Sequence, residues 1–501
     1  MKRRKRSLTY LDQISYESKI KWSEIVRPLV RDKRFPHFFS SFNNATLSQK
    51  KVEQKHPEQN TGKGVVIAIL DDGVDYTHPA IQASYRADLS FDFTHDKMDA
   101  KPEKSKDNNH GTNCAGIVVM PPASACGVGA AYGSKVAGLK MLGGDSVNDV
   151  MEGEALLHKF QEIDIYSVSW GPKDDGRSME GPHRLAQIAL SKGYRMGRSG
   201  KGSIYIWASG NGGLEHDDCA MDGYASNIYT ITFGMFGEGG SPVWYTEGCP
   251  AIMASLSAED NHGFRTTDVD GACTFFTGSS AAAPLASGII ALVLEENPNL
   301  TQRDVQHLIV RTSNSSLLAQ QSPSLWKVNG AGLNVSRMFG FGSLDAKKLI
   351  KNAAVWKNVE KENICSKELV LKEKITFTHE LSAVINIPFP GCQNTSSEVN
   401  YVEKVELQVS IHHDRRGDIV LDLESPSGTV IRLLERRIYD NSEIGILNWP
   451  FVASHFWGEN AVGVWKLYVH DEGKTNGGVI SHLNLLVIGT ENDVMKNVEI
   501  I

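Results

Sequence analysis

The sequence lacks the features that mark a membrane-spanning or nucleic-acid-binding chain. No apolar run in its 501 residues reaches bilayer-spanning length, and no apolar signal region opens it. The formal net charge of −7 is small and negative, which disfavours a nucleic-acid partner. Internal repeats and low-complexity tails are missing. The chain is too long for one ordinary domain, so two or three are expected.

Cysteine is also scarce, with seven residues in the whole chain. In an oxidising compartment this odd number favours three disulfides and one free thiol. Five N-x-S/T sequons are compatible with a secretory route, beginning at Asn44, Asn299, Asn314, Asn334 and Asn394.

The first two thirds of the chain alternate apolar strands with helical patterns. Strands are expected over Val65–Leu70, Lys135–Met141, Ile163–Ser169 and Gly202–Ala208, and helices over Glu152–Phe160 and His183–Lys192. Because Val65–Leu70 is apolar throughout, it is typical of a strand that is buried on both faces. The rhythm predicts an α/β fold with a doubly wound parallel sheet.

The pattern changes after about residue 355 to short alternating strands and turns. Strands are expected over Val402–Ile411, Asp418–Leu423, Val430–Leu434, Val464–Val469 and Ser481–Ile488. This pattern predicts an all-β sandwich or jelly roll. We expect an N-terminal segment over residues 1–54, an α/β domain over 55–354 and a β domain over 362–495.

Three residues fall where such a fold places functional groups. Asp71 follows the first strand, His110 begins a run of small residues, and Ser280 lies at the start of an apolar helix. Each has an ordinary alternative: an Asp-Gly turn, a structural histidine and a serine N-cap. Together they suit nucleophilic catalysis, in which His110 takes the proton of Ser280 and Asp71 orients the imidazole. The Ser280 backbone N–H and the Asn211 side chain are the candidate oxyanion donors.

The motifs around these residues resemble those of subtilisin-family serine endopeptidases of the kexin/furin (proprotein convertase) type. They are Leu-Asp-Asp-Gly, His-Gly-Thr-x-Cys-Ala-Gly, Trp-Ala-Ser-Gly-Asn-Gly-Gly and Thr-Gly-Ser-Ser-Ala-Ala-Ala-Pro. The order Asp…His…Ser is that of subtilisin. The β-rich end resembles the P domain of that family. The resemblance implies cleavage of precursor proteins or prohormones after paired basic residues, in the Golgi, in secretory granules or after secretion.

The resemblance also implies a substrate cleft with acidic subsites. Its candidate residues are Asp72, Asp107, Glu152, Ser169, Trp170, Gly171, Asp174, Glu180, Asp222 and Tyr224. Clustered carboxylates in a cleft would bind Arg and Lys side chains through charge-assisted hydrogen bonds. The alternative is that these acids are solvated surface charges.

Calcium is the implied cofactor, with Asp174, Asp217 and Glu247 as its ligands. They would lie beneath the primary pocket, the one that holds the basic side chain just before the scissile bond. Two further family sites have lost ligands. The first keeps Asp32 but has Ala80 and Ala123, and the second keeps Asp92 and Asp99 but has Lys97 between them. One well-formed calcium site is therefore expected.

The resemblance implies disulfides Cys126–Cys273, Cys219–Cys249 and Cys365–Cys392, which leaves Cys114 as a free, buried thiol. The opening cluster Lys2–Arg6 could be a localisation signal, or the junction at which a propeptide is cut so that Ser7 begins the mature chain. In the latter case the propeptide, an intramolecular inhibitor and folding aid in this family, would lie upstream of this chain. Two rival functions stay open: an inactive convertase-like binding protein and a subtilase of broader specificity.

Overall fold

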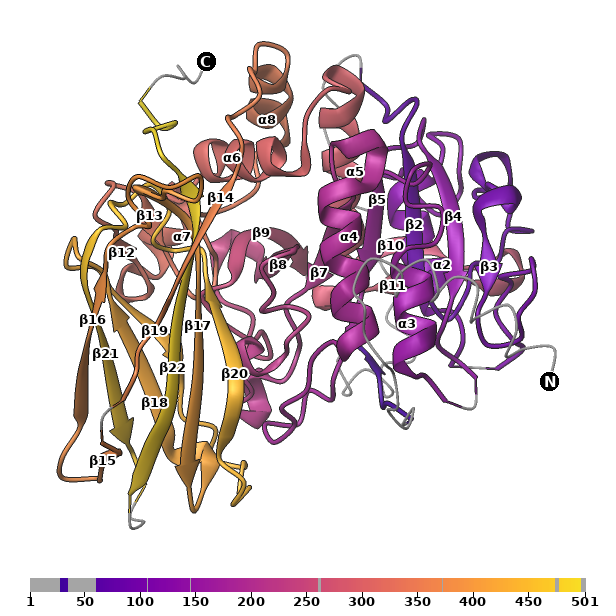
Figure 1. The fold of residues 1–501 in the computed structure, drawn as a ribbon. Helices are drawn as coiled ribbons and strands as arrows, with labels where there is room; N and C mark the ends of the chain where they lie inside the picture. Colours follow the sequence, from indigo (N-terminus) through magenta and orange to yellow (C-terminus); the bar gives the residue numbers. More distant parts are fainter. Residues whose placement is uncertain are drawn as a thin grey trace.

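A computed structural model describes residues 28–34, 60–105, 107–144, 146–259, 263–371, 373–473 and 477–496. The basic cluster Lys2–Arg6, Ser7 and the sequon at Asn44 lie outside the described residues. Figure 1 shows an α/β part, in indigo to pink, beside an all-β part in orange and yellow.

The α/β part is built on a seven-stranded sheet in which every described pairing is parallel. Its spatial order is β3 (Phe91–Asp92), β4 (Lys135–Lys140), β2 (Val66–Asp71), β5 (Ile165–Val168), β7 (Ile204–Ala208), β8 (Thr230–Gly237) and β9 (Ile252–Glu259). All six residues of β2 are buried, as its apolar run predicts. The predicted α/β class and parallel sheet are confirmed.

Helices flank this sheet. In the described part of the chain they are α2 (His110–Val119), α3 (Asp149–Leu156), α4 (Arg184–Gly200), α5 (Ser279–Glu296), α6 (Gln302–Thr312), α7 (Ser316–Gln321) and α8 (Ala346–Ala353). The helix expected over Glu152–Phe160 begins earlier, because the Asn148 side chain accepts hydrogen bonds from Val150 N and Met151 N and caps it there. α5 is long and apolar enough to cross a membrane, but 89% of it is buried inside the fold, as in a core helix.

The all-β part consists of two antiparallel sheets. One contains β14 (Asn363–Glu368), β22 (Gly478–Thr490), β17 (Tyr401–His413) and β20 (Ile446–Ala453), with β15 (Ile375–Phe377) also on β22. The other contains β16 (Ala383–Phe389), β21 (Gly463–Asp471), β18 (Ile419–Glu424) and β19 (Val430–Leu434). All five predicted strands are present. β20 is a strand that the sequence does not suggest, because Pro450 interrupts its pattern.

Short strands complete the architecture. β10 (Phe264–Thr267) pairs with β11 (Cys273–Phe276), and β12 (Lys327–Val328) pairs with β13 (Asn334–Val335). β1 (Asp32–Lys33) pairs antiparallel with β6 (Trp170–Gly171), which directly follows β5 at the carboxyl end of the sheet. The three disulfides are those that the resemblance implies, and Cys114 is free and buried.

Candidate active site

The structure brings Asp71, His110 and Ser280 into one hydrogen-bonded row. Asp71 ends β2, His110 begins α2 and Ser280 is the second residue of α5. His110 Nδ1 lies 2.7 Å from Asp71 Oδ2, and His110 Nε2 lies 2.9 Å from Ser280 Oγ. All three are buried. In this geometry a histidine can remove the hydroxyl proton while a carboxylate fixes its tautomer.

Asn211 lies beside Ser280, just after β7. Its side-chain Oδ1 accepts a hydrogen bond from Ser279 N at 3.0 Å, and its backbone N–H donates to Asp174 Oδ2 at 2.8 Å. The side chain is thus held in one orientation. Its Nδ2 group is buried and has no hydrogen-bond partner in the described part of the chain. A buried donor without a partner is costly, so it indicates a place for an acceptor such as an oxyanion.

The cleft beside these residues holds an extended segment of the chain itself, Arg31–Arg34. Its strand β1 pairs Asp32 with Gly171 and Lys33 with Trp170, and Arg34 N donates to Ser169 O at 3.1 Å. Ser280 Oγ donates to the carbonyl oxygen of Arg34. Strand addition of this kind is a common way to bind an extended peptide.

Three basic side chains of this segment enter the predicted acidic subsites. The Arg34 guanidinium, which is 1% exposed, pairs with Asp222 Oδ2 and donates to Ala208 O at 2.6 Å. Lys33 Nζ lies 2.6 Å from Asp72 Oδ2 and also contacts the carbonyl oxygen of Asp107. Asp107 is itself exposed, so it contributes its backbone rather than the carboxylate that we expected.

Arg31 occupies the third subsite. Its Nε lies 2.7 Å from Glu152 Oε1, its Nη1 lies 2.9 Å from Glu180 Oε1, and its Nη2 donates to Tyr224 Oη at 2.7 Å. Tyr224 in turn donates to Glu152 Oε2 at 2.6 Å. Glu152 and Tyr224 are therefore not solvated surface groups.

Because the acidic groups of these subsites are buried, their ionised forms depend on a nearby cation. Burial raises the pKa of Glu152 above its usual value, and the charge of Arg31 opposes the shift. For Asp72, burial and then the neighbouring charge of Asp71 raise the pKa, while Lys33 lowers it. An ionised carboxylate in such a place is stabilised only when a basic group comes close.

The three residues expected to bind calcium lie around Gly212. A Cβ built on Gly212 would lie 2.7 Å from Asp217 Cβ and 3.0 Å from Glu247 Oε1, close to the backbone of Asp174. Burial raises the pKa of Asp217 to about 6, and burial followed by the charges of Asp174 and Asp217 raises the pKa of Glu247 well above its usual value. Carboxylate oxygens are hard donors, so the chemistry of these three residues suits Ca²⁺.

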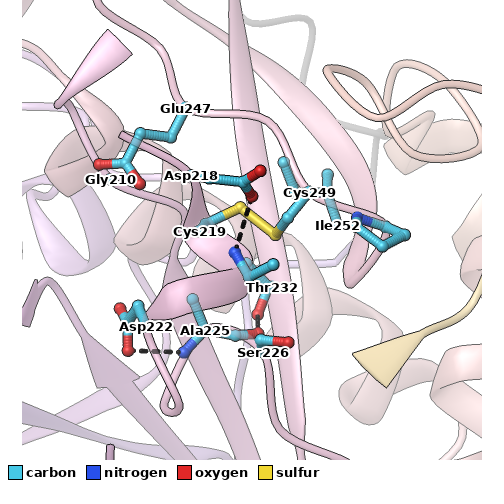
Figure 2. Close-up of a disulfide and its surroundings, with 12 residues drawn as sticks. Gly210, Asp218, Cys219, Asp222, Ala225, Ser226, Thr232, Glu247, Cys249 and Ile252 are labelled. Carbon is cyan, nitrogen blue, oxygen red and sulfur yellow. Dashed lines mark hydrogen bonds between the residues drawn. A yellow bond between two sulfur atoms is a disulfide. The ribbon is translucent and has the colours of Figure 1, made fainter. Parts of the chain in front are cut away.

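Figure 2 shows the disulfide that connects the loops of the primary pocket and the candidate calcium site. The Cys219–Cys249 disulfide joins the loop of Asp218 and Asp222 to the loop of Glu247, which lies close to Gly210. The primary pocket and the candidate calcium site thus share one covalent support.

The other two calcium sets do not fit calcium. Asp32, which we expected as a remaining calcium ligand, lies instead in β1 opposite Gly171 in the cleft. The Asp92 carboxylate already contacts ammonium groups: Lys140 Nζ lies 3.2 Å and Lys97 Nζ 3.9 Å from Asp92 Oδ2. Two ammonium groups therefore compete with a divalent ion for this one carboxylate.

The occupant of the cleft, Arg31–Arg34, is not predicted from the sequence. The signal was available, since Arg-Asp-Lys-Arg itself contains the paired basic residues of the expected substrate. The sequence-based hypothesis placed the junction at Lys2–Arg6 instead, which lies outside the described residues.

Comparisons with known proteins identify the family of this chain. The model of the subtilase family matches residues 62–342, and that of the proprotein convertase P-domain matches residues 402–487. Endoprotease aex-5 of Caenorhabditis elegans is 43% identical over 408 residues, which cover 81% of this chain and 72% of that protein.

Two longer relatives match most of this chain. Furin-like protease 1 (isoforms 1/1-X/2) of Drosophila melanogaster is 42% identical over 445 residues, 87% of this chain and 34% of that protein. Proprotein convertase subtilisin/kexin type 5 of Mus musculus is 40% identical over 487 residues, 91% of this chain and 26% of that protein. The chain thus spans about a third or less of the length of these two relatives.

Solved structures show the same fold. The crystal structure of a serine protease of Aeromonas sobria superposes with a TM-score of 0.74 at 21% sequence identity, covering 86% of this chain and 89% of that one. At this identity the likeness shows a subtilisin-like α/β fold followed by a β domain, and it carries no conclusion about substrate.

Proposed function

The chain belongs to the subtilase family, in its kexin/furin group of proprotein convertases, and from that premise we propose that it is a calcium-dependent serine endopeptidase that cleaves precursor proteins after paired basic residues. The catalytic residues are the triad Asp71, His110 and Ser280. The enzyme would act in the secretory pathway. The observation that carries the proposal is the placement of Arg31, Lys33 and Arg34 against Glu152, Asp72 and Asp222, with the Arg34 carbonyl at Ser280 Oγ.

In the proposed reaction His110 Nε2 takes the proton of Ser280 Oγ as that oxygen attacks the carbonyl carbon of the residue in the primary pocket. Asp71 stabilises the resulting imidazolium. The negative charge on the substrate oxygen is met by Asn211 Nδ2 and the Ser280 N–H. His110 then returns the proton to the leaving amine, and a water molecule hydrolyses the acyl-enzyme by the same route.

The specificity follows from the charges around the cleft. Arg34 uses Asp222 and a backbone carbonyl at the base of the pocket, so a neutral side chain there would leave a buried carboxylate without a partner. Calcium bound by Asp174, Asp217 and Glu247 would supply positive charge beneath this pocket and hold its loops.

The segment Arg31–Arg34 makes the chain its own first substrate. We place the propeptide junction after Arg34 rather than after Arg6, so the residues up to Arg34 inhibit the enzyme until they leave the cleft. The proposed partners are this segment, acting within the molecule, and external precursor proteins with the same basic pattern.

The test uses the full chain and its Ser280→Ala variant, produced in parallel in the presence of calcium. The expected result is a new N-terminus at residue 35 in the wild type and an intact chain in the variant. An Arg-x-Lys-Arg reporter should be cleaved by the wild type, and a strong chelator should abolish that cleavage.

Two results would contradict the proposal. Equal processing of the Ser280→Ala chain would show that another protease makes the cut. Equal rates on reporters with neutral residues before the scissile bond would favour a subtilase of broader specificity.

A further inference from the structure

The β domain reaches the candidate calcium site with one buried side chain. Arg437, in the loop between β19 and β20, is 1% exposed. Its Nε and Nη2 lie 3.1 and 3.0 Å from Asp217 Oδ1, and Nη2 also donates to Ser178 O at 2.6 Å. The guanidinium therefore bridges the two loops that carry Asp174 and Asp217.

The charge of Arg437 is available to Asp217. Arg437 Nη1 contacts Asp440 Oδ2 at 2.9 Å, but Asp440 is also held by Arg416, whose Nε lies 2.6 Å from Oδ2 and whose Nη2 lies 3.1 Å from Oδ1. Two guanidinium groups thus face two carboxylates in this cluster. Since Arg416 balances Asp440, Arg437 balances Asp217.

Arg437 differs from the other guanidinium near these carboxylates. Arg34, whose charge acts on Glu247, belongs to the segment that occupies the primary pocket and leaves it when substrate exchanges. Arg437 is fixed in the β domain, where its backbone N–H also donates to Gly417 O at 2.9 Å. It is therefore a permanent neighbour of the calcium ligands.

We propose that Arg437 is a positioning residue: a counter-cation, supplied by the β domain, that holds the calcium-binding carboxylates together when calcium is absent. The proposal rests on the proposed function for the identity of the ion. Arg437 touches no part of the cleft segment among the described contacts, so it acts through Asp217. The β domain would then make the pocket less dependent on calcium.

The test compares thermal unfolding of the full chain with saturating calcium and with strong chelator. In Arg437→Met the three carboxylates lose a fixed positive charge, and calcium can replace much of it. The variant should lose more stability in chelator than in calcium, so the calcium-induced rise in Tm should widen by roughly 5 °C. Arg437→Lys keeps the charge but loses the forked contacts, and should widen the rise by less.

Arg436→Met is the matched control. Arg436 is the neighbouring residue, but its guanidinium pairs with Asp418 inside the β domain, with Nε 3.0 Å and Nη2 2.8 Å from Oδ1. Its removal should leave the calcium-induced rise in Tm unchanged.

Equal losses of Tm with and without calcium in Arg437→Met would show that Arg437 only joins the two domains and would overturn the proposal. So would a wild-type Tm that does not respond to calcium. If Arg437→Met does not fold, the same comparison in Arg437→Gln decides, because Gln keeps hydrogen-bond donors but removes the charge. Because unfolding is measured without substrate, failure of the reporter to be cleaved would count against the proposed function and not against this inference.

Discussion

At the scale of single residues, individual buried side chains serve both the fold and the site. Asp72 Oδ1 accepts the N–H of Gly111 at 2.8 Å and Asp72 Oδ2 that of His110 at 3.1 Å, which fixes the start of α2, while Oδ2 also pairs with Lys33. Asn211 is similar, since its Oδ1 accepts from the Ser279 N–H and its Nδ2 has no partner among the described residues, which leaves it available to a ligand. In each side chain, hydrogen bonds to the backbone fix the position of the atom that meets the ligand.

Asn211 gives a residue-scale prediction. Asn211→Ala should lower kcat by roughly 10²–10³, the range seen when one oxyanion donor is removed from a serine protease, with KM changed only a few-fold. Steady-state kinetics on an Arg-x-Lys-Arg reporter would measure both. Asn211→Asp is the matched variant, because it keeps an acceptor for Ser279 N but loses the Nδ2 donor. A kcat within three-fold of wild type in either variant would reject this role, because such a change corresponds to only about RT in the activation free energy.

At the scale of elements, the site depends on how closely α2 lies against the end of β2. Gly111 makes this approach possible, because a Cβ there would lie 2.3 Å from Gly73 O and 3.0 Å from both Asp71 Cβ and Asp72 Oδ1. The backbone of Gly73 cannot make room for a methyl group at this distance unless the helix shifts. The hydrogen bond between His110 and Asp71 is therefore set by the contact of a helix with a strand.

Gly111→Ala should consequently displace the first turn of α2 and lower kcat by more than 10-fold, an effect of over about 1.4 kcal/mol on the barrier. Gly64→Ala is a suitable control, since no atom lies within 4 Å of its Cβ and its φ of 86° adds only local strain. The control should lose some Tm and keep its kcat. Unchanged kcat in Gly111→Ala would mean that the helix tolerates the methyl group.

The elements also show what the sequence could predict. Uninterrupted apolar runs such as the one that forms β2 identify the parallel sheet, and short motifs at strand and helix ends identify Asp71, His110 and Ser280. The pairing of β1 with β6 joins residues more than a hundred positions apart, and β1 is two residues long. So short a charged strand has no periodicity, and its partner is fixed only by the folded cleft.

At the scale of the whole molecule, the two parts are joined by buried charge that local patterns cannot reveal. Glu403 in β17 accepts from Arg303 of α6, with Nε 2.8 Å from Oε2 and Nη2 2.6 Å from Oε1. His307, one turn further along α6, places Nε2 2.8 Å from Glu403 Oε1. A glutamate in an alternating strand predicts a solvated side chain, whereas here it lies between the two domains at 3% exposure.

This junction gives a pH-dependent prediction. Burial acts to raise the pKa of Glu403, but the charges of His307 and Arg303 outweigh it and hold that pKa well below the usual 4.5. A carboxyl group whose folded-state pKa is depressed contributes stability that is fully present above its unfolded pKa and is lost as the pH falls below it. The contribution of Glu403 should therefore be present at pH 5 and shrink below about 4.5.

Glu403→Gln should lower the free energy of unfolding by about 3 kcal/mol at neutral pH, because it leaves the buried Arg303 guanidinium without a charged partner. Denaturant unfolding at pH 5 and 3.5 would show a wild-type advantage that is smaller at the lower pH. Glu435→Gln is the control, since its carboxylate is half exposed where it pairs with Arg432 at 2.9 Å and with Arg337 at 3.5 Å, and each such pair should be worth less than about 1 kcal/mol. A difference between wild type and Glu403→Gln that persists undiminished at pH 3.5 would show that shape rather than charge at position 403 holds the two domains together.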